Sequence, residues 1–325
     1  MTVFIIRRLM QAVMVVFVMS FLVFGGVNIV GDPVEMMVSD EADQAERERV
    51  IKSMGLDKPW YVQYGRFVAN AVHGDLGKSF VYGEESLGII LQRMPATFEL
   101  ALAALMLAIV IGIPLGVYAG LKSESRISRV IMAGSILGFS LPTFWVGLMF
   151  IMVFAVMLGW LPSTGRGETV DVMGIPVSFL TADGLSHLLL PALNLALFKI
   201  SLVIRLARAG TREVVHQDYI KFARAKGLST RRVIFVHLMK NIMIPVVTVL
   251  GLEFGGLIAF SVVTETVFAW PGMGKLIIDS IQTLDRPVIV AYLMVIVMVF
   301  VVINLIVDVL YSILDPRVRL QDVHA

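Results

Sequence analysis

The sequence has no cysteine and few charged residues for its length, and both deficits exclude classes of protein. Without Cys, the chain has neither a disulfide framework nor thiolate chemistry. Asp, Glu, Lys and Arg together make up 16% of the residues, against 58% hydrophobic residues and a mean hydropathy of +0.85. This balance is typical of integral membrane proteins. The five His are scattered, without an H-E-x-x-H pair, so we expect no metal site and no cofactor.

Sequence signatures of catalysis are also missing. The stretch from Gly74 to Ser79 reads GDLGKS and invites comparison with a P-loop, which requires another Gly five positions before its Gly-Lys pair. That position holds Val72, so we interpret the stretch as a turn on the outer face. The chain offers no nucleophile paired with a base either. We therefore predict that it is not an enzyme.

Long apolar runs dominate the rest of the sequence. A membrane-spanning helix needs about 20 mostly apolar residues. Six segments satisfy this requirement, at about 9–29, 100–120, 131–160, 188–207, 242–263 and 289–311. We therefore predict an all-α polytopic membrane protein with six transmembrane helices. The third segment is long enough to be tilted, or kinked at Pro142.

The predicted spans divide the chain into parts. The expected parts are an N-terminal end with the first span at 1–30, a small insertion at 31–95, a transmembrane core at 96–312 with a long internal loop at 208–241, and a tail at 313–325. Within the insertion, the charged stretch from Ala42 to Met54 predicts a helix.

Basic residues sort by side of the membrane. Arg7 and Arg8 precede the first span, and the loops at 122–129 and 208–241 are rich in Lys and Arg. The loops at 162–186 and 264–288 are slightly acidic. Because basic loops are retained on the cytoplasmic side, we expect both chain ends in the cytoplasm.

The segment from Gly210 to Pro245 is the only long polar interruption in the second half of the chain. Val214, Val215, Tyr219, Phe222 and Ala223 recur at roughly helical spacing, which predicts a short amphipathic helix. A glycine at 227 would end that helix, and Ser229 would restart and cap another one. Two short helices joined at a glycine form a projection that another protein can grip.

Several motifs in this segment and elsewhere carry a resemblance to a known family. Asp218-Tyr219-Ile220, Ala223 to Leu228, His237, Asn241 and Pro245 resemble the "EAA" loop of ABC importer permeases, most closely that of the B-type subunits of dipeptide and oligopeptide importers. Further motifs in the order of that family are Gly31-Asp32-Pro33, Gly74 to Gly77, Pro95 to Leu100, Trp270 to Gly274, Asn304 with Asp308, and Asp315-Pro316-Arg317.

This resemblance implies a function and a set of partners. The fold would be that of a type I ABC importer permease with a small periplasmic insertion, in the bacterial inner membrane. The expected partners are a second homologous permease subunit, two ABC ATPase subunits that hydrolyse ATP, a periplasmic binding protein that delivers di- or oligopeptides, and the lipid bilayer, with no nucleic acid. The residues implied to dock the ATPase are Asp218, Tyr219, Phe222, Ala223, Arg224, Ala225, Lys226, Gly227 and Leu228.

Two ionisable residues fall near the middle of predicted spans. Lys199 lies in the fourth span and Glu253 in the fifth, where an isolated charge is costly. They either line or gate the translocation path, or form a structural pair between helices. Alternative functions that remain open are a secondary transporter driven by an ion gradient through this pair, and an importer of the same branch that carries glutathione, a nickel complex or a sugar.

The charge pattern yields a test of orientation. A reporter fused after Arg319 should be active only in the cytoplasm, and one inserted near Asp40 only outside. The measurement is the activity of a paired cytoplasmic and extracytoplasmic reporter at each position. Reversed activities would overturn the predicted topology.

Overall fold

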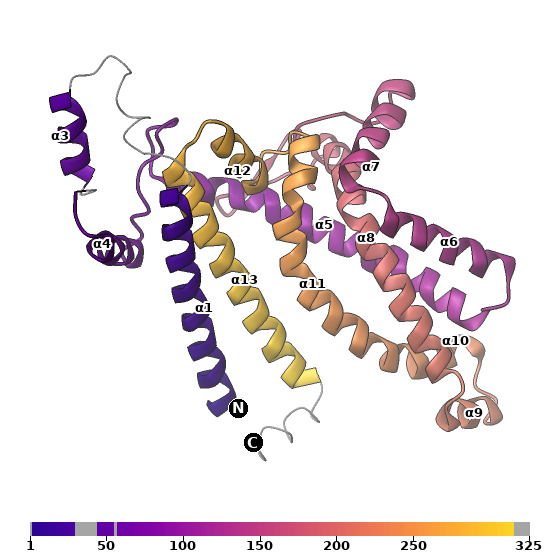
Figure 1. Ribbon diagram of the computed structural model, residues 1–325. Helices are drawn as coiled ribbons and strands as arrows, with labels where there is room; N and C mark the ends of the chain where they lie inside the picture. Colours follow the sequence, from indigo (N-terminus) through magenta and orange to yellow (C-terminus); the bar gives the residue numbers. More distant parts are fainter. Residues whose placement is uncertain (1, 30–43, 55–56, 315–325) are drawn as a thin grey trace. The chain divides into compact units, whose positions relative to one another are not determined.

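The computed structural model describes residues 2–29, 44–54 and 57–314, and these are mostly helical (Figure 1). The predicted turn at Gly31-Asp32-Pro33 and the tail motif Asp315-Pro316-Arg317 lie outside the described residues. The chain divides into two compact units, one of Met1–Arg93 with Leu276–Val302, the other of Met94–Lys275 with Ile303–Ala325.

The first unit is built around an N-terminal helix and the segment that follows it. Its elements are α1 (Thr2–Ile29), α3 (Gln44–Met54), α4 (Trp60–Val72), the start of α5 (Ser86–Leu121), and most of α12 (Met273–Gln282) and α13 (Arg286–Leu314). Tyr64 of α4 packs its ring against Phe17, Phe21 and Phe24 of α1, with ring centroids 5.5–6.3 Å apart. Its hydroxyl lies 2.8 Å from the Ser20 hydroxyl, which joins the two helices through a polar contact as well.

The GDLGKS stretch is a turn in this unit. Gly74 and Gly77 adopt positive φ angles of 82° and 88°, a conformation that a residue with a Cβ disfavours. The buried Asp285 carboxylate accepts hydrogen bonds from the Ser79 hydroxyl and, at 3.1 Å, from the Phe80 amide. The backbone here is therefore held by a carboxylate.

The second unit is a helical bundle around α8. Its elements are most of α5, then α6 (Arg126–Ser140), α7 (Thr143–Phe150), the π-helix η1 (Ile151–Met157), the antiparallel hairpin β1 (Val170–Val172) and β2 (Ile175–Val177), α8 (Ala182–Val214), α9 (Asp218–Ala225), α10 (Thr230–Arg232), the π-helix η2 (Val233–Leu238), α11 (Met239–Val267) and the end of α13. Helices α6, α7 and α11 all pack on α8. Most of the buried residues of the unit lie on α5, α8 and α11.

Three glycines on one face of α5 bring it close to α8. A Cβ built on Gly112 would lie 2.8 Å from Val203, one on Gly116 would lie 2.6 Å from the Ile204 carbonyl oxygen, and one on Gly120 would lie 2.5 Å from the Thr211 side chain. No real side chain fits at such distances. The spacing of four residues places all three glycines on one helix face, as in the small-residue packing of membrane helices.

Among the described residues, five helices are long and apolar enough to cross a membrane, and a sixth span results if the bent pair of α6 with α7 and η1 is counted as one. The expected third span at 131–160 is therefore not a single helix, because the pair bends by 108°. Leu141 has an extended backbone, with φ −83° and ψ 136°, which is the conformation that a following proline favours. Pro142 thus ends α6 at Ser140.

Other spans are longer than the hydropathy pattern predicted. Helix α5 begins at Ser86, although the expected span began at residue 100, so the motif Pro95 to Leu100 lies inside the helix. Helix α8 continues to Val214, well beyond the expected end at residue 207. The hydropathy pattern identifies only the part of a helix that meets lipid. The helical backbone hydrogen bonds continue beyond it into more polar sequence, so the helices are longer than the predicted spans.

The close contact between α5 and α8 predicts that the same substitution, Gly to Ala, has opposite effects on stability in α5 and in α6. Gly116→Ala should lower the stability of the isolated protein by about 1–3 kcal/mol, because its Cβ would press on the α8 backbone. Gly134→Ala on α6 should be neutral or stabilising by about 0.5–1 kcal/mol, since a Cβ there meets nothing within 4 Å and alanine favours a helix. The measurement is thermal unfolding of the purified protein in detergent. Equal effects at the two glycines would contradict the packing argument.

Candidate functional site

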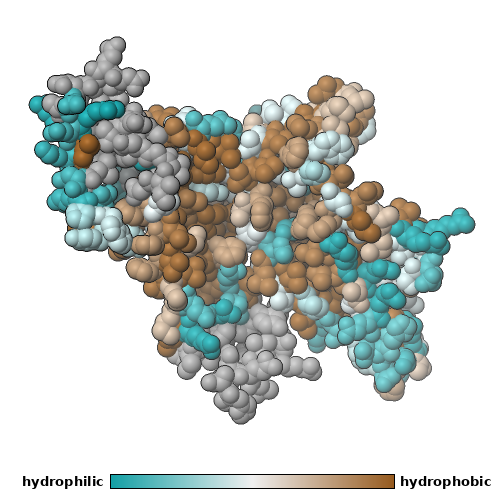
Figure 2. Space-filling model, viewed as in Figure 1, coloured by the Kyte–Doolittle hydropathy of each residue, from teal (hydrophilic) through white to brown (hydrophobic). Residues whose placement is uncertain are grey.

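The polar segment between α8 and α11 folds as a short amphipathic helix followed by a turn. Helix α9 begins at Asp218 and ends at Ala225, and Gly227 then adopts a positive φ of 71°. The glycine at this position fits its conformation, because a residue with a Cβ would be strained there. In Figure 2, hydrophilic residues gather over α9 and α10, whereas the helices leading to them are largely hydrophobic. The segment thus presents a polar surface at the end of apolar helices.

The two faces of α9 differ in exposure. Ile220 and Ala223 are buried, and the helix packs on η2. On the outer face, Phe222 is 61% exposed and Tyr219 is 42% exposed. We expected Ala223 to share that outer face, but it is only 5% exposed and belongs to the inner one. The outward apolar surface of α9 therefore consists of Tyr219 and Phe222.

The remaining residues of the segment surround this apolar surface. Lys226 lies over the Phe222 ring, with its Nζ 4.6 Å from the ring centroid. The Lys221 Nζ lies 2.9 Å from an oxygen of Asp218. Exposed residues are Asp218, Arg224, Ala225, Lys226 and Gly227, whereas Leu228 is half-buried. A mixed polar rim thus encloses an aromatic centre.

A side-chain hydrogen bond connects this segment to the start of α11. Burial raises the pKa of the Tyr219 phenol above its ordinary value, while a hydrogen bond with the Asn241 side chain lowers it in part, so the phenol is neutral at physiological pH. Ser229 occupies the N-cap position of α10, but its hydroxyl makes no capping hydrogen bond, contrary to our expectation. The chain then continues through the π-helix η2, whose wider turns carry Val233 and Leu238 inward.

The structure brings Lys199 and Glu253 together, from α8 and α11. The Lys199 Nζ donates a hydrogen bond to Glu253 Oε2. The Lys199 side chain is 9% exposed, and that of Glu253 is 36% exposed. Both line a cavity of about 470 Å³, whose other walls come from Thr143, Leu195, Phe198, Gly256, Leu257, Phe260, Val263 and Thr264. The ion pair is therefore accessible from a space with mainly apolar walls.

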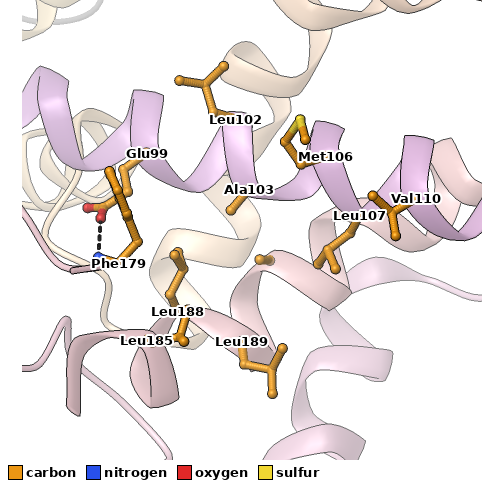
Figure 3. A pocket seen from close by; sticks show the side chains of 11 residues that line it. Glu99, Leu102, Ala103, Met106, Leu107, Val110, Phe179, Leu185, Leu188 and Leu189 are labelled. Atoms are coloured by element: carbon orange, nitrogen blue, oxygen red, sulfur yellow. Dashed lines mark hydrogen bonds between the residues drawn. The ribbon is translucent and has the colours of Figure 1, made fainter. Parts of the chain in front are cut away.

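A second cavity, of about 530 Å³, lies between α5 and α8 (Figure 3). Its lining is apolar except for Glu99, and the residues are Glu99, Leu102, Ala103, Met106, Leu107, Val110, Phe179, Leu185, Leu188, Leu189 and Ala192. The Glu99 carboxylate is already occupied, because Arg166 Nε donates to it at 3.0 Å and the Phe179 amide at 3.0 Å. This cavity offers a polar ligand no available partner.

Sequence reasoning did not identify two buried carboxylates that hold the loops of this unit. Glu99 accepts hydrogen bonds from both sides of the hairpin, from Arg166 before it and, at 2.6 Å, from the Ser178 amide after it. Glu99 lies one residue before the predicted second span, so the sequence gave no reason to expect that its side chain is buried. The motif Pro95 to Leu100 was noted only for its resemblance.

Glu265, at the end of α11, joins two of the motifs. Its carboxylate accepts hydrogen bonds from the Thr97 hydroxyl at 2.8 Å and from the Lys275 amide at 3.0 Å. A Cβ on Gly272 would lie 2.4 Å from Glu265 Oε2, and Trp270 Nε1 donates to the Ala96 carbonyl at 2.8 Å. The motifs Pro95 to Leu100 and Trp270 to Gly274 are therefore two halves of one hydrogen-bonded cluster.

A helical membrane protein with an ion pair in a cavity between its spans and a short amphipathic helix beyond them fits the class of transporter permease subunits. The chain belongs to the family described as binding-protein-dependent transport system inner membrane component, whose model matches residues 112–320; the N-terminal model of the same family matches residues 1–101. This assignment removes the support for a carrier driven by an ion gradient.

Named relatives match over nearly the whole chain. The di/tripeptide transport system permease protein DppB of Pseudomonas aeruginosa is 39% identical, over 98% of this chain and 99% of the relative. The oligopeptide transport system permease protein AppB of Bacillus subtilis is 40% identical, over 98% of this chain and 100% of the relative. The dipeptide transport system permease protein DppB of Escherichia coli K12 is 35% identical, over 97% and 98%.

A solved structure supports the fold. The MetNI methionine ABC transporter, in inward-facing conformations, has a chain that aligns with a TM-score of 0.53 at 14% identity, covering 70% of this chain and 96% of that one. At this identity the likeness concerns the arrangement of helices alone.

The contact between Lys199 and Glu253 predicts unequal effects of single and double substitution. Lys199→Met alone should destabilise the protein by roughly 1–3 kcal/mol, less than for a fully buried pair, since it leaves the Glu253 carboxylate without its partner. Adding Glu253→Gln should restore much of that loss. The measurement is a double-mutant cycle on thermal unfolding. Additive effects would show that the two side chains do not interact.

Proposed function

We propose that this chain is one permease subunit of an ATP-driven importer of di- and oligopeptides. The observation that carries the proposal is the match to peptide permeases along nearly the full length of this chain and of those relatives. A cavity that contains both a cation and an anion agrees with a substrate that carries both charges.

The complete transporter would contain other proteins. The partners that we propose are a second homologous permease, two ABC ATPase subunits and a periplasmic binding protein that delivers the peptide. The transporter would lie in the bacterial inner membrane, with both ends of this chain in the cytoplasm, because the basic segments at 122–129 and 208–241 then face the cytoplasm.

The proposed coupling runs through α9. Tyr219 and Phe222 would enter a groove of an ATPase subunit, and the surrounding residues from Asp218 to Lys226 would supply polar contacts at the rim. The inner face, with Ile220 and Ala223, stays packed on η2, so a displacement of α9 is passed to the base of α11. ATP-driven closure of the ATPase pair would then switch the permease pair between inward-open and outward-open states.

This proposal predicts different consequences for neighbouring residues of α9. Phe222→Glu should leave the permease folded, because the side chain is 61% exposed, yet it should abolish peptide uptake and reduce the amount of ATPase that co-purifies. Ala223→Glu should instead destabilise the segment, because it would bury a charge at a position that is 5% exposed.

The matched control is Phe80→Glu, the same substitution at an exposed Phe in the turn near Gly77. It should retain the ATPase subunits. The readouts are uptake of radiolabelled dialanine, thermal stability and the stoichiometry of the purified complex. Full ATPase retention in Phe222→Glu would contradict a docking role for α9.

A further inference from the structure

We propose that Lys199 and Glu253 form the site in the permease that binds the two charged ends of a peptide. The inference rests on the proposed function and specifies how the substrate would be recognised. In this site the ion pair opens, the Glu253 carboxylate binds the peptide ammonium group, and the Lys199 ammonium binds the peptide carboxylate.

Access to the pair supports this assignment. Glu253 is 36% exposed, and both side chains line the cavity. Gly256 leaves space beside them, since a Cβ at this position would lie 3.8 Å from Glu253 Oε2 and 3.9 Å from Lys199 Nζ. A larger side chain there would extend over both charged atoms. The glycine therefore keeps the pair open to a ligand.

The dimensions suit a short peptide. The cavity volume is about 470 Å³, within the range of roughly 300–1,000 Å³ that is usual for small-molecule sites. An extended dipeptide is roughly 7 Å long, a distance that two long side chains can bridge once they separate. The apolar walls, which include Leu195, Phe198 and Phe260, provide contact for side chains without requiring a particular one.

The site would select a zwitterion because Lys199 and Glu253 can exchange each other for the two charged groups of such a ligand. Charges between membrane helices are costly when they lack partners. A zwitterion replaces each partner with a group of the same charge, so neither Lys199 nor Glu253 is left alone. A neutral ligand, such as a sugar, would have to separate the pair without replacing either partner. The same cavity would therefore accept many peptides and reject uncharged molecules of equal size.

The absence of Cys from the natural chain permits a direct test. In the assembled transporter in nanodiscs, Phe260→Cys places a thiol on the cavity wall at a position that is 75% exposed. Leu252→Cys, on the same helix and 50% exposed but outside the cavity lining, is the matched control. Modification by a small methanethiosulfonate reagent is followed by mass spectrometry of this chain.

Millimolar dialanine should slow modification at residue 260 at least fivefold and leave residue 252 unaffected. N-acetyl-dialanine amide, which lacks both charges, should protect neither. Adding Glu253→Gln to Phe260→Cys should remove the protection. Val263→Cys, on the same wall, serves as the reporter if Phe260→Cys does not assemble. Equal protection by the charged and the blocked peptide, or none by either, overturns the proposed site.

A measurement of peptide uptake distinguishes a failure of the proposed site from a failure of the proposed function on which it rests. The doubly neutral variant Lys199→Met with Glu253→Gln removes both charges without leaving one unpaired, so the complex should assemble. Its uptake of dialanine should fall at least tenfold, mainly through a higher KM. If the wild-type transporter takes up dialanine and this variant takes it up equally well, the proposed site is wrong while the proposed function stands. If the wild-type transporter carries no peptide, the proposed function fails, and the site fails with it.

Discussion

A carboxylate among apolar helices is tolerated only with partners, and the second unit depends on how three of them are satisfied. Glu265 binds Thr97 and the backbone near Lys275, and Glu99 binds Arg166 and the residues after the hairpin. Each of these two carboxylates fixes a loop to a helix, so that the loops are held by hydrogen bonds within an apolar setting. Glu253 differs, since its partner is a single side chain in a cavity.

This difference separates the structural carboxylates from the functional candidate. Glu99 and Glu265 accept several hydrogen bonds each, many of them from backbone amides that cannot move without unfolding the loop. The bond between Glu253 and Lys199 joins two flexible side chains and can be exchanged for bonds to a ligand. The two cavities differ in the same way, because the one beside Glu99 contains a carboxylate that is already saturated.

Hydropathy and charge sufficed to predict the helical membrane class, the positions of most spans, the helix at α9 and its end near Gly227. These features are local, and each depends on a few neighbouring residues. For the third span the sequence left a tilt and a kink at Pro142 as alternatives, and the structure has the kink. The burial of Ala223 was harder to predict, because it depends on what packs against α9. Glu265 was missed because a carboxylate near a span end resembles an ordinary loop charge. The sequence left the contact of Lys199 with Glu253 as one of two alternatives, because this contact depends on the relative register of α8 and α11.

The length of α8 has a mechanical consequence. This helix runs for 33 residues, from the hairpin held by Glu99 to the segment that leads into α9. The glycines of α5 lock onto it at three successive turns, so the two helices resist sliding past one another. At 1.5 Å per residue the rod is about 50 Å long, and a tilt of about 10° would carry one end roughly 9 Å relative to the other. A tilt of α8 would therefore change the position of the hairpin relative to the polar end that leads into α9, so these two ends of the unit do not move independently.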